Sequence, residues 1–225
     1  MIVQALTLTL RLAIMVSAIL LVIGVPLAYW LAFSHRRWKF LVEAVVSLPI
    51  VLPPTVLGFY VLVAVGPLSP VGRWYQALTG HTLAFTFEGL VIGSVLYSLP
   101  FAVQPMATSF AAIDGKLLDA SALLGASRWR TFWRIVLPLG LPGVVTGLVL
   151  SFAHTLGEFG VVLMIGGNIP GATQTVSILI YDQVQALDYA TANRTALILL
   201  LLCFTILAIL YGLRRRGVWN VWEWK

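Results

Sequence analysis

Two ionisable side chains lie inside an apolar stretch, SFAHTLGEFGVVL, which covers residues 151–163. His154 and Glu158 are four residues apart, so they would share one face of a helix. A histidine and a carboxylate are groups used in metal ligation and in acid–base catalysis. A charged side chain at bilayer depth is costly and usually lies in a bundle interior or along a water-filled path.

Three interpretations of Glu158 follow from this pattern. In the first, Glu158 is a metal ligand or an acid/base of an intramembrane enzyme. In the second, it binds a transported ion. In the third it is structural: it pairs with His154, another span or freed backbone donors, while Gly157 and Gly160 permit a bend and close helix contact. We favour the structural role, because no nucleophile or third ligand stands beside Glu158 in the motifs searched.

Other chemical motifs are missing from the sequence. The phosphate-binding pattern G-x-x-x-x-G-K-[ST] fails, because the single Gly-Lys pair, Gly115-Lys116, is followed by Leu117 and has Phe110 where the first glycine belongs. The sequence has no H-E-x-x-H zinc pattern and no G-x-S-x-G elbow. We therefore predict no catalytic residues, no metal site and no cofactor bound by this chain.

The composition indicates an integral membrane protein. Of the 225 residues, 60% are hydrophobic and 10% are charged, whereas soluble domains carry about 25% charged residues. The net charge of +6 fits cytoplasmic loops and lipid headgroups. A basic stripe with stacking aromatics is missing, so we expect no nucleic-acid partner.

Five segments are apolar enough to cross a membrane as helices of about 20 residues. We therefore expect an all-α integral membrane protein in which residues 1–225 form a single transmembrane domain. The predicted spans are residues 12–33, 41–65, 89–106, 139–165 and 196–213.

The positive charges predict the orientation of the chain. Eleven of the 14 Lys and Arg residues lie after the first span, between the third and fourth spans, or in the tail. The remaining three are Arg11, Arg73 and Arg194. Cytoplasmic loops carry the excess of Lys and Arg, so we expect the N-terminus outside and the C-terminus in the cytoplasm. The tail tryptophans Trp219, Trp222 and Trp224 are expected at the membrane interface.

Prolines interrupt two of the predicted spans. Each proline removes a backbone donor and clashes with the preceding turn. Broken helices at membrane depth occur where protein or a water-filled cavity covers the freed backbone. Two explanations of these prolines remain open: they produce ordinary kinks in packed helices, or they belong to segments that line a transport path. The prolines concerned are Pro49, Pro53, Pro54, Pro100 and Pro105.

The segment 114–138, DGKLLDASALLGASRWRTFWRIVLP, lies on the predicted cytoplasmic side. Apolar residues recur there at helical spacing until Gly125, which is placed as a glycine that ends a helix. Ser127 can cap a second helix that carries Arg130 and Arg134 one turn apart. An amphipathic, cationic pair of helices can lie on lipid headgroups or dock on a partner.

This segment resembles the EAA loop of the permease subunits of binding-protein-dependent ABC importers. The resemblance implies a type I permease fold with this coupling segment docked on an ATP-hydrolysing subunit. Asp119 stands for the usual Glu and Ser121 for the second Ala. The residues that carry the match and its charge are Asp119, Ala120, Ser121, Gly125, Arg128, Arg130, Ile135, Leu137 and Pro138.

Two further stretches resemble the molybdate group of these permeases. One is the GEFG element, formed by Gly157, Glu158, Phe159 and Gly160. The other is an external segment that includes Asn168, Ile169, Pro170, Gly171, Thr173 and Thr175. The resemblance implies a homodimer in the bacterial inner (plasma) membrane, two ATP-binding subunits that hold ATP and Mg²⁺, and an extracytoplasmic oxyanion-binding protein.

Molybdate is a dianion, which a carboxylate such as Glu158 would repel. The centres of the spans contain no Lys or Arg, and a conduit should not grip its ion. We therefore expect a path lined by backbone and hydroxyl groups, including Thr55, Ser94, Ser98, Ser151 and Thr155. Tungstate or sulfate import, an intramembrane enzyme using His154 and Glu158, and a passive channel stay open as alternatives.

Overall fold

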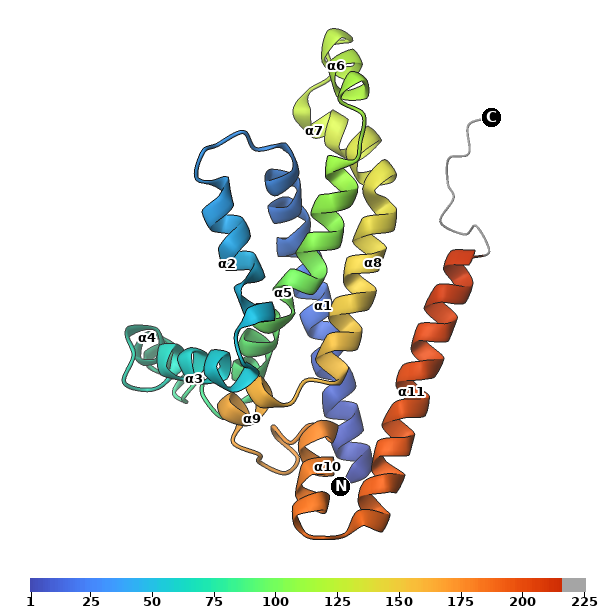
Figure 1. Ribbon diagram of the computed structural model, residues 1–225. Coiled ribbons are helices and arrows are strands. Elements are labelled where there is room, and N and C mark those ends of the chain that lie inside the picture. Colours follow the sequence, from blue (N-terminus) through green and yellow to red (C-terminus); the bar gives the residue numbers. More distant parts are fainter. Residues whose placement is uncertain (216–225) are drawn as a thin grey trace.

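The computed structural model describes residues 1–215, and it describes side chains for residues 1–209, 211 and 212. It is an elongated assembly of helices (Figure 1). The predicted interfacial tryptophans Trp219, Trp222 and Trp224 lie outside the described residues. The helices are α1 Ile2–Phe33, α2 Lys39–Val51, α3 Pro54–Val65, α4 Pro70–Thr79, α5 Phe87–Ala111, α6 Gly115–Leu123, α7 Arg128–Thr131, a π-helical turn Phe132–Val136, α8 Leu137–Leu156, α9 Gly160–Gly166, α10 Val176–Gln185 and α11 Tyr189–Arg215.

The centre of the molecule is a bundle of α1, α5 and α8 (Figure 1). Its core is apolar and includes the fully buried Leu12, Leu20 and Phe110. Small residues let α8 lie directly on α5. A Cβ atom added at Gly143 would stand 2.7 Å from the Pro105 carbonyl oxygen, so the close approach depends on glycine there.

Four helices within the described residues are long and apolar enough to cross a membrane, and the bent pair α2–α3 makes a fifth candidate. This confirms the predicted all-α architecture. Three predicted spans become longer helices: α1 begins at Ile2, α5 extends from Phe87 to Ala111, and α11 begins at Tyr189. Hydropathy marks the apolar centre of a span, whereas the helix itself continues into more polar turns.

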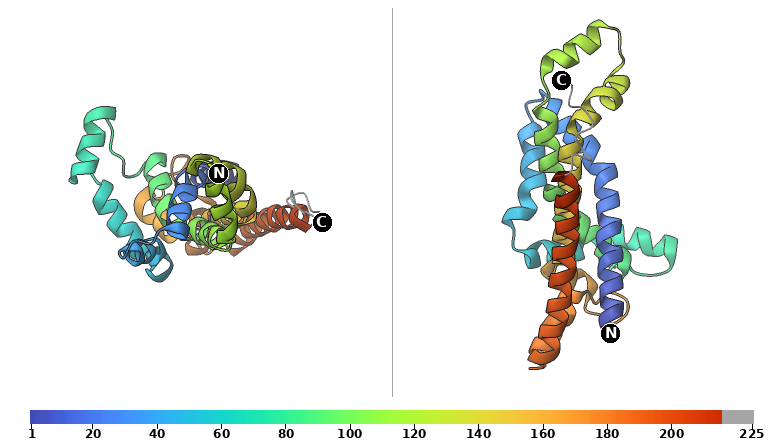
Figure 2. Two further views of the ribbon diagram at one scale, coloured as in Figure 1. Left: turned by 90° about the horizontal axis from the view of Figure 1, so that it is seen from above. Right: turned by 90° about the vertical axis from the view of Figure 1, so that its right-hand side faces the viewer.

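The second predicted span, residues 41–65, is wrong as a single rod. It is broken into α2 and α3, which are bent by 117°. Leu52 and Pro53 between them are extended. Two successive prolines cause the break, because each lacks an N–H and each disfavours helix in the residue before it. As a result α3 turns sideways and, with α4, projects from the bundle (Figures 1 and 2).

The fourth predicted span, residues 139–165, is also wrong as a continuous helix. Helix α8 ends at Leu156, and a short α9 begins at Gly160. Helix α9 packs on α3: a Cβ atom at Gly160 would lie 2.7 Å from Pro54 Cβ, and one at Gly58 would lie 2.9 Å from Met164 Cβ. The two broken spans therefore meet at glycine contacts.

The two ends of the bundle carry different elements. The N-terminus and α10 lie at one end, and α6 and α7 lie at the other, toward which α11 also runs (Figure 1). This arrangement agrees with the predicted orientation. Helix α10 is attached to α1, because the Val176 N–H donates to the Thr9 hydroxyl at 3.0 Å.

Candidate functional site: the helical hairpin and the cavity

The predicted coupling segment forms a helical hairpin at the end of the bundle. The Asp114 carboxylate accepts a hydrogen bond from the Lys116 N–H at 2.9 Å and caps α6. Gly125 has φ 71°, and the Ala126 N–H returns to the Ser121 carbonyl at 3.1 Å. The prediction that Gly125 ends this helix is confirmed, because its left-handed backbone favours a residue without Cβ.

The second helix of the hairpin begins as predicted. The Ser127 hydroxyl accepts from the Arg130 N–H at 3.3 Å. A further contact joins the two helices: the hydroxyls of Ser121 and Thr131 lie 2.8 Å apart, and Ser121 is buried. Sequence reasoning missed this bond, because Ser121 was taken as a stand-in for alanine.

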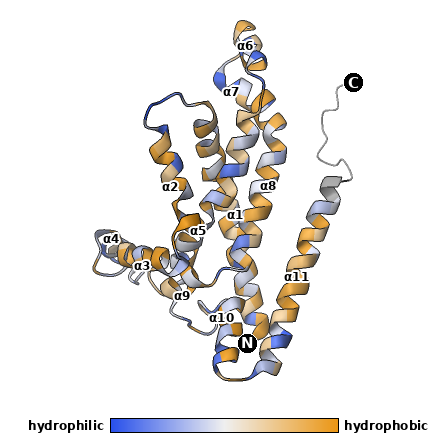
Figure 3. Ribbon diagram, viewed as in Figure 1, coloured by the Kyte–Doolittle hydropathy of each residue, from blue (hydrophilic) through white to orange (hydrophobic). Residues whose placement is uncertain are grey.

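Large apolar side chains are exposed on the hairpin. The exposed fractions are 89% for Leu123, 87% for Leu124 and 70% for Trp129. Asp119, Ala120, Arg128 and Arg130 are exposed beside them. The hairpin stands beyond the end of the bundle and mixes apolar and polar residues (Figure 3). Grouped apolar exposure with charges around it is typical of a protein-binding surface.

A π-helical turn joins the hairpin to α8. Its closing bond runs from the Leu137 N–H to the Phe132 carbonyl, one residue wider than an α-helical bond. Pro138 follows directly. Because proline has no N–H, it cannot donate the α-helical hydrogen bond to the Arg134 carbonyl, and the wider turn accommodates the proline. The Phe132 ring also packs edge-on against Tyr29 of α1 at 5.3 Å. Ile135, Leu137 and Pro138 are half-buried.

The predicted sharing of one helix face by His154 and Glu158 is wrong. Helix α8 ends at Leu156, so Glu158 lies past the helix. His154 instead places Nδ1 3.0 Å from the Ser98 hydroxyl and stacks on Phe101 with ring centroids 4.0 Å apart. Within the described residues no three His, Cys, Asp or Glu side chains gather in a way that could hold a metal.

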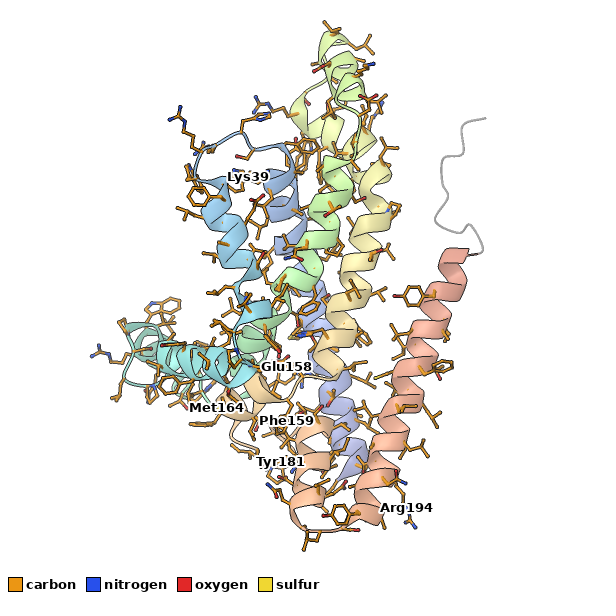
Figure 4. All side chains as sticks on the ribbon, viewed as in Figure 1. Lys39, Glu158, Phe159, Met164, Tyr181 and Arg194 are labelled. Atoms are coloured by element: carbon orange, nitrogen blue, oxygen red, sulfur yellow. The ribbon has the colours of Figure 1, made fainter. Side chains whose placement is uncertain are left out.

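Glu158 is buried at the junction of α8, α9 and the broken second span (Figure 4). It is 3% exposed, and neither carboxylate oxygen has a hydrogen-bond partner in the described structure. The Ser94 hydroxyl is a polar neighbour, but the two groups do not meet hydrogen-bond geometry, and Ser94 also lacks a partner. The expected pairing of Glu158 is therefore not formed in this conformation.

The other members of the GEFG element shape the same junction. The Gly157 N–H donates a hydrogen bond to the His154 carbonyl at 3.2 Å, at the end of α8. Phe159 packs against Tyr181 of α10 with ring centroids 5.1 Å apart (Figure 4). Of the prolines, Pro49 is buried in α2, while Pro53 and Pro54 form the bend and the start of α3. The predicted interruption of the third span is wrong, because α5 continues from Phe87 to Ala111 with Pro100 and Pro105 inside it.

Most of the hydroxyl groups predicted to line a path are buried instead. Ser94, Ser98 and Ser151 are fully buried, and Thr155 is 1% exposed. Ser98 bonds to Thr155 at 3.0 Å, and Thr155 donates to the Ser151 carbonyl at 2.9 Å. These four hydroxyls lie in the packing of α5 and α8 and do not face a path in this conformation. Thr55 is exposed.

An open cavity of about 550 Å³ lies between α2, α5 and α8. The described residues that line it include no charged side chain. Its polar side chains are Gln104, Thr108, Ser109 and Thr146. Sequence reasoning missed these residues, since nothing in the spacing of a polar residue shows whether it faces a neighbouring helix or open space.

The external segment is a tightly bonded loop between α9 and α10. The Asn168 amide donates to both carboxylate oxygens of Asp182, at 3.0 and 2.9 Å. Gln174 donates to Asn168 and to Asp182. Thr173 donates to the Gly166 carbonyl at 2.6 Å. Thr173 and Thr175 are buried, and Ile169, Pro170 and Gly171 are exposed.

Asp182 and Gln174 are structural residues that sequence reasoning did not single out. A second acid of this region, Asp188, caps α11 by accepting from the Thr191 N–H at 3.1 Å. Hydrogen bonds from the Thr191 side chain and backbone hold the pKa of Asp188 below its usual value.

The model of one protein family matches most of this chain. The family is described as "Binding-protein-dependent transport system inner membrane component", and the match covers residues 24–218. That stretch contains the hairpin, both broken spans and the external loop. The chain belongs to this family. It is therefore a multi-pass permease of the inner membrane.

Three relatives show which permeases are similar. The molybdenum transport system permease protein ModB of Azotobacter vinelandii is 52% identical over 94% of this chain and 93% of its own length. The protein of the same name in Haemophilus influenzae is 40% identical over 78% of each chain. A probable sulfate transport permease of Chlorokybus atmophyticus is 33% identical over 76% of this chain and 59% of its own length.

Solved structures support the fold. The chain superimposes with a TM-score of 0.74 on a chain of a bacterial alginate ABC transporter in complex with a periplasmic protein, covering 95% of this permease and 78% of that chain at 19% identity. It superimposes with a TM-score of 0.73 on a chain of the MetNI methionine ABC transporter, covering 96% and 95% at 18% identity. The permease thus has an ABC importer fold of type I.

Proposed function

We propose that this permease carries molybdate into the cell as the membrane subunit of an ATP-driven importer. The observation that carries the proposal is the 52% identity, over nearly the whole of both chains, to a permease named for molybdenum transport. The more distant match to a permease named for sulfate transport, at 33%, favours molybdate over sulfate.

The energy comes from separate subunits. The sequence lacks the phosphate-binding glycine loop, so ATP and Mg²⁺ belong to two ATP-binding subunits on the cytoplasmic side. These subunits dock on the coupling segment, residues 114–138. The exposed Leu123, Leu124 and Trp129 give the apolar contact, and Arg128 and Arg130 give the polar rim.

The complete transporter contains two copies of this single-domain permease. The cavity between α2, α5 and α8 is open, so one copy does not enclose a path. An extracytoplasmic oxyanion-binding protein delivers the ion to the opposite end from the hairpin. The exposed Ile169, Pro170 and Gly171 of the external segment belong to that surface.

The test is uptake into proteoliposomes that contain the permease and its ATP-binding subunits, with the binding protein supplied outside. Molybdate, tungstate and sulfate compete for uptake, and ATP is omitted in the control. We expect molybdate uptake that requires ATP and exceeds that of sulfate. Sulfate uptake in preference to molybdate would overturn the substrate, and flux without ATP would indicate a passive channel and overturn the importer.

A further inference from the structure

Three uncharged hydrogen-bond donors lie together on the facing surfaces of α2 and α5. Gln104 and Thr108 are one turn apart on α5, and Gln104 donates to the hydroxyl of Ser47 on α2 at 3.1 Å. The Ser47 hydroxyl and the second amide hydrogen of Gln104 remain available to donate. The Thr108 side chain is exposed, and its hydroxyl makes no hydrogen bond within the described residues.

These donors face open space. Gln104 and Thr108 line the cavity of about 550 Å³, and with Ser47 they also line a second cavity of about 400 Å³. Both volumes fall in the range of small-ligand sites, roughly 300–1,000 Å³. The donors therefore stand where two cavities adjoin the same stretch of α5.

The hydroxyl groups of the other polar side chains in the larger cavity already donate hydrogen bonds to backbone carbonyls. The Thr146 hydroxyl donates to the Pro142 carbonyl at 2.7 Å. The Ser109 hydroxyl donates to the Gly140 carbonyl at 3.4 Å. An anion needs donors, so Thr146 and Ser109 offer it little, although they line the same space.

The charges around the site suit weak binding of an anion. Among the residues that the structure describes, none that lines the larger cavity is charged. In the smaller cavity the charged residues are Lys39 and Glu43, which lie 3.4 Å apart as an ion pair. Neutral donors form stronger hydrogen bonds to an anion than to a neutral acceptor. Without an unpaired cation the anion is not held tightly, and conduction needs sites that release their ion.

We propose that Ser47, Gln104 and Thr108 form a transit site that binds a tetrahedral oxyanion during its passage, an inference that rests on the proposed function. The oxygens of the dianion accept from the Ser47 hydroxyl, the Gln104 amide and the Thr108 hydroxyl. The site replaces part of the hydration of the ion.

The test compares two isosteric threonine substitutions in the complete transporter. Thr108→Val removes an available donor, and Thr146→Val removes a donor that is already used. The measured quantity is molybdate taken up per ATP hydrolysed, with saturating loaded binding protein. We expect Thr108→Val to lower this ratio about tenfold, the factor carried by one hydrogen bond to a charged group. Thr146→Val should leave it unchanged, and Thr108→Ser should restore it.

A second variant places a charge in the site. Gln104→Glu keeps the size of the side chain and adds a negative charge beside the path of a dianion. We expect uptake to fall at least as far as in Thr108→Val, while ATP hydrolysis stimulated by the binding protein continues. Gln104→Leu, which removes the donors without adding charge, should give a smaller loss than Gln104→Glu.

The outcomes separate the two proposals. If the wild-type transporter shows no ATP-dependent molybdate uptake, the proposed function fails. If the wild type transports but Thr108→Val keeps the wild-type ratio, the transit site is overturned. Equal losses in Thr108→Val and Thr146→Val, or a parallel fall of uptake and ATP hydrolysis with the ratio kept, would show a packing role and overturn it as well.

Discussion

At the scale of single residues, Glu158 is the most unusual group in the described structure. It is buried, and neither of its carboxylate oxygens has a hydrogen-bond partner among the described residues. An uncompensated buried charge costs several kcal/mol. Glu158 lies past the end of α8 and beside the bend of the second span. It is therefore part of the junction where both broken spans meet.

Replacement of Glu158 by Gln tests whether the permease needs a charge there. Glu158→Gln keeps the shape of the side chain and removes the ionised form, so we expect wild-type thermal stability and wild-type ATP-dependent uptake. Glu158→Lys should abolish uptake, because it buries a cation without a partner. The measurements are the melting temperature in detergent and uptake into proteoliposomes.

The result for Glu158→Gln decides between a structural and a charged role. A folded Glu158→Gln protein that no longer transports would contradict the structural role and would show that transport requires the negative charge. His154→Ala provides the comparison, because His154 bonds to Ser98 and not to Glu158.

At the scale of elements, the hairpin of residues 114–138, which we propose couples ATP hydrolysis to transport, depends on the turn at Gly125. Its φ of 71° is a left-handed conformation, which costs roughly 1–2 kcal/mol for an ordinary L-residue and less for asparagine. Open space surrounds the missing Cβ. The turn therefore restricts this position through its backbone and not through crowding.

Gly125→Val should abolish uptake and the stimulation of ATP hydrolysis by the binding protein, while membrane insertion stays normal. Gly125→Asn should retain most activity, because asparagine adopts the left-handed conformation more readily. Gly125→Asp places a charge on the docking surface and should also uncouple the transporter. Normal transport by Gly125→Val would contradict the coupling role of the hairpin.

The Ser121–Thr131 bond gives a second prediction for the same element. The hydroxyls lie 2.8 Å apart, and Ser121 is buried, so the bond should stabilise the hairpin by about 1 kcal/mol. Ser121→Ala and Thr131→Val should each weaken the coupling of ATP hydrolysis to uptake. The double variant should be no worse than either single one. Additive losses would show that the two residues act independently.

At the scale of the whole molecule, the described part of α11 leaves a large apolar surface uncovered. It leans away from the bundle (Figures 1 and 2) and exposes Leu200, Leu201 and Phe204 by more than half. The cavity on α2, α5 and α8 is also open. In the homodimer proposed above, a second copy of the chain would cover part of this surface and the open cavity.

We therefore expect the purified permease, without its ATP-binding subunits, to be a dimer of 24.6 kDa chains in mild detergent. Light scattering coupled to size-exclusion chromatography, corrected for detergent, measures this mass. Phe204→Lys should weaken the dimer, because it puts a charge on the uncovered face of α11, whereas Ser177→Lys on α10 serves as a control away from that face. A monomeric wild-type protein that still transports after reconstitution would contradict the homodimer.

The sequence by itself determined the features that depend on local chemistry. Hydropathy located the spans, because a bilayer requires long apolar runs. The excess of Lys and Arg predicted the orientation. Gly125 and Ser127 marked the end of one helix and the start of the next in segment 114–138, since helix caps depend on the residue type at one position. Resemblance in the coupling segment and the external loop indicated the importer class.

The tertiary structure decided what depends on the neighbours of each side chain. Prolines predicted breaks, but the 117° bend of α2 and α3 and its contact with Gly160 required the packing of distant segments. Ser98 and Thr108 look alike in the sequence, yet one is buried against His154 and the other faces a cavity. Glu158 and His154 stand four residues apart but lie on different elements. Burial and pairing depend on contacts between residues far apart in the chain, and local spacing does not encode them.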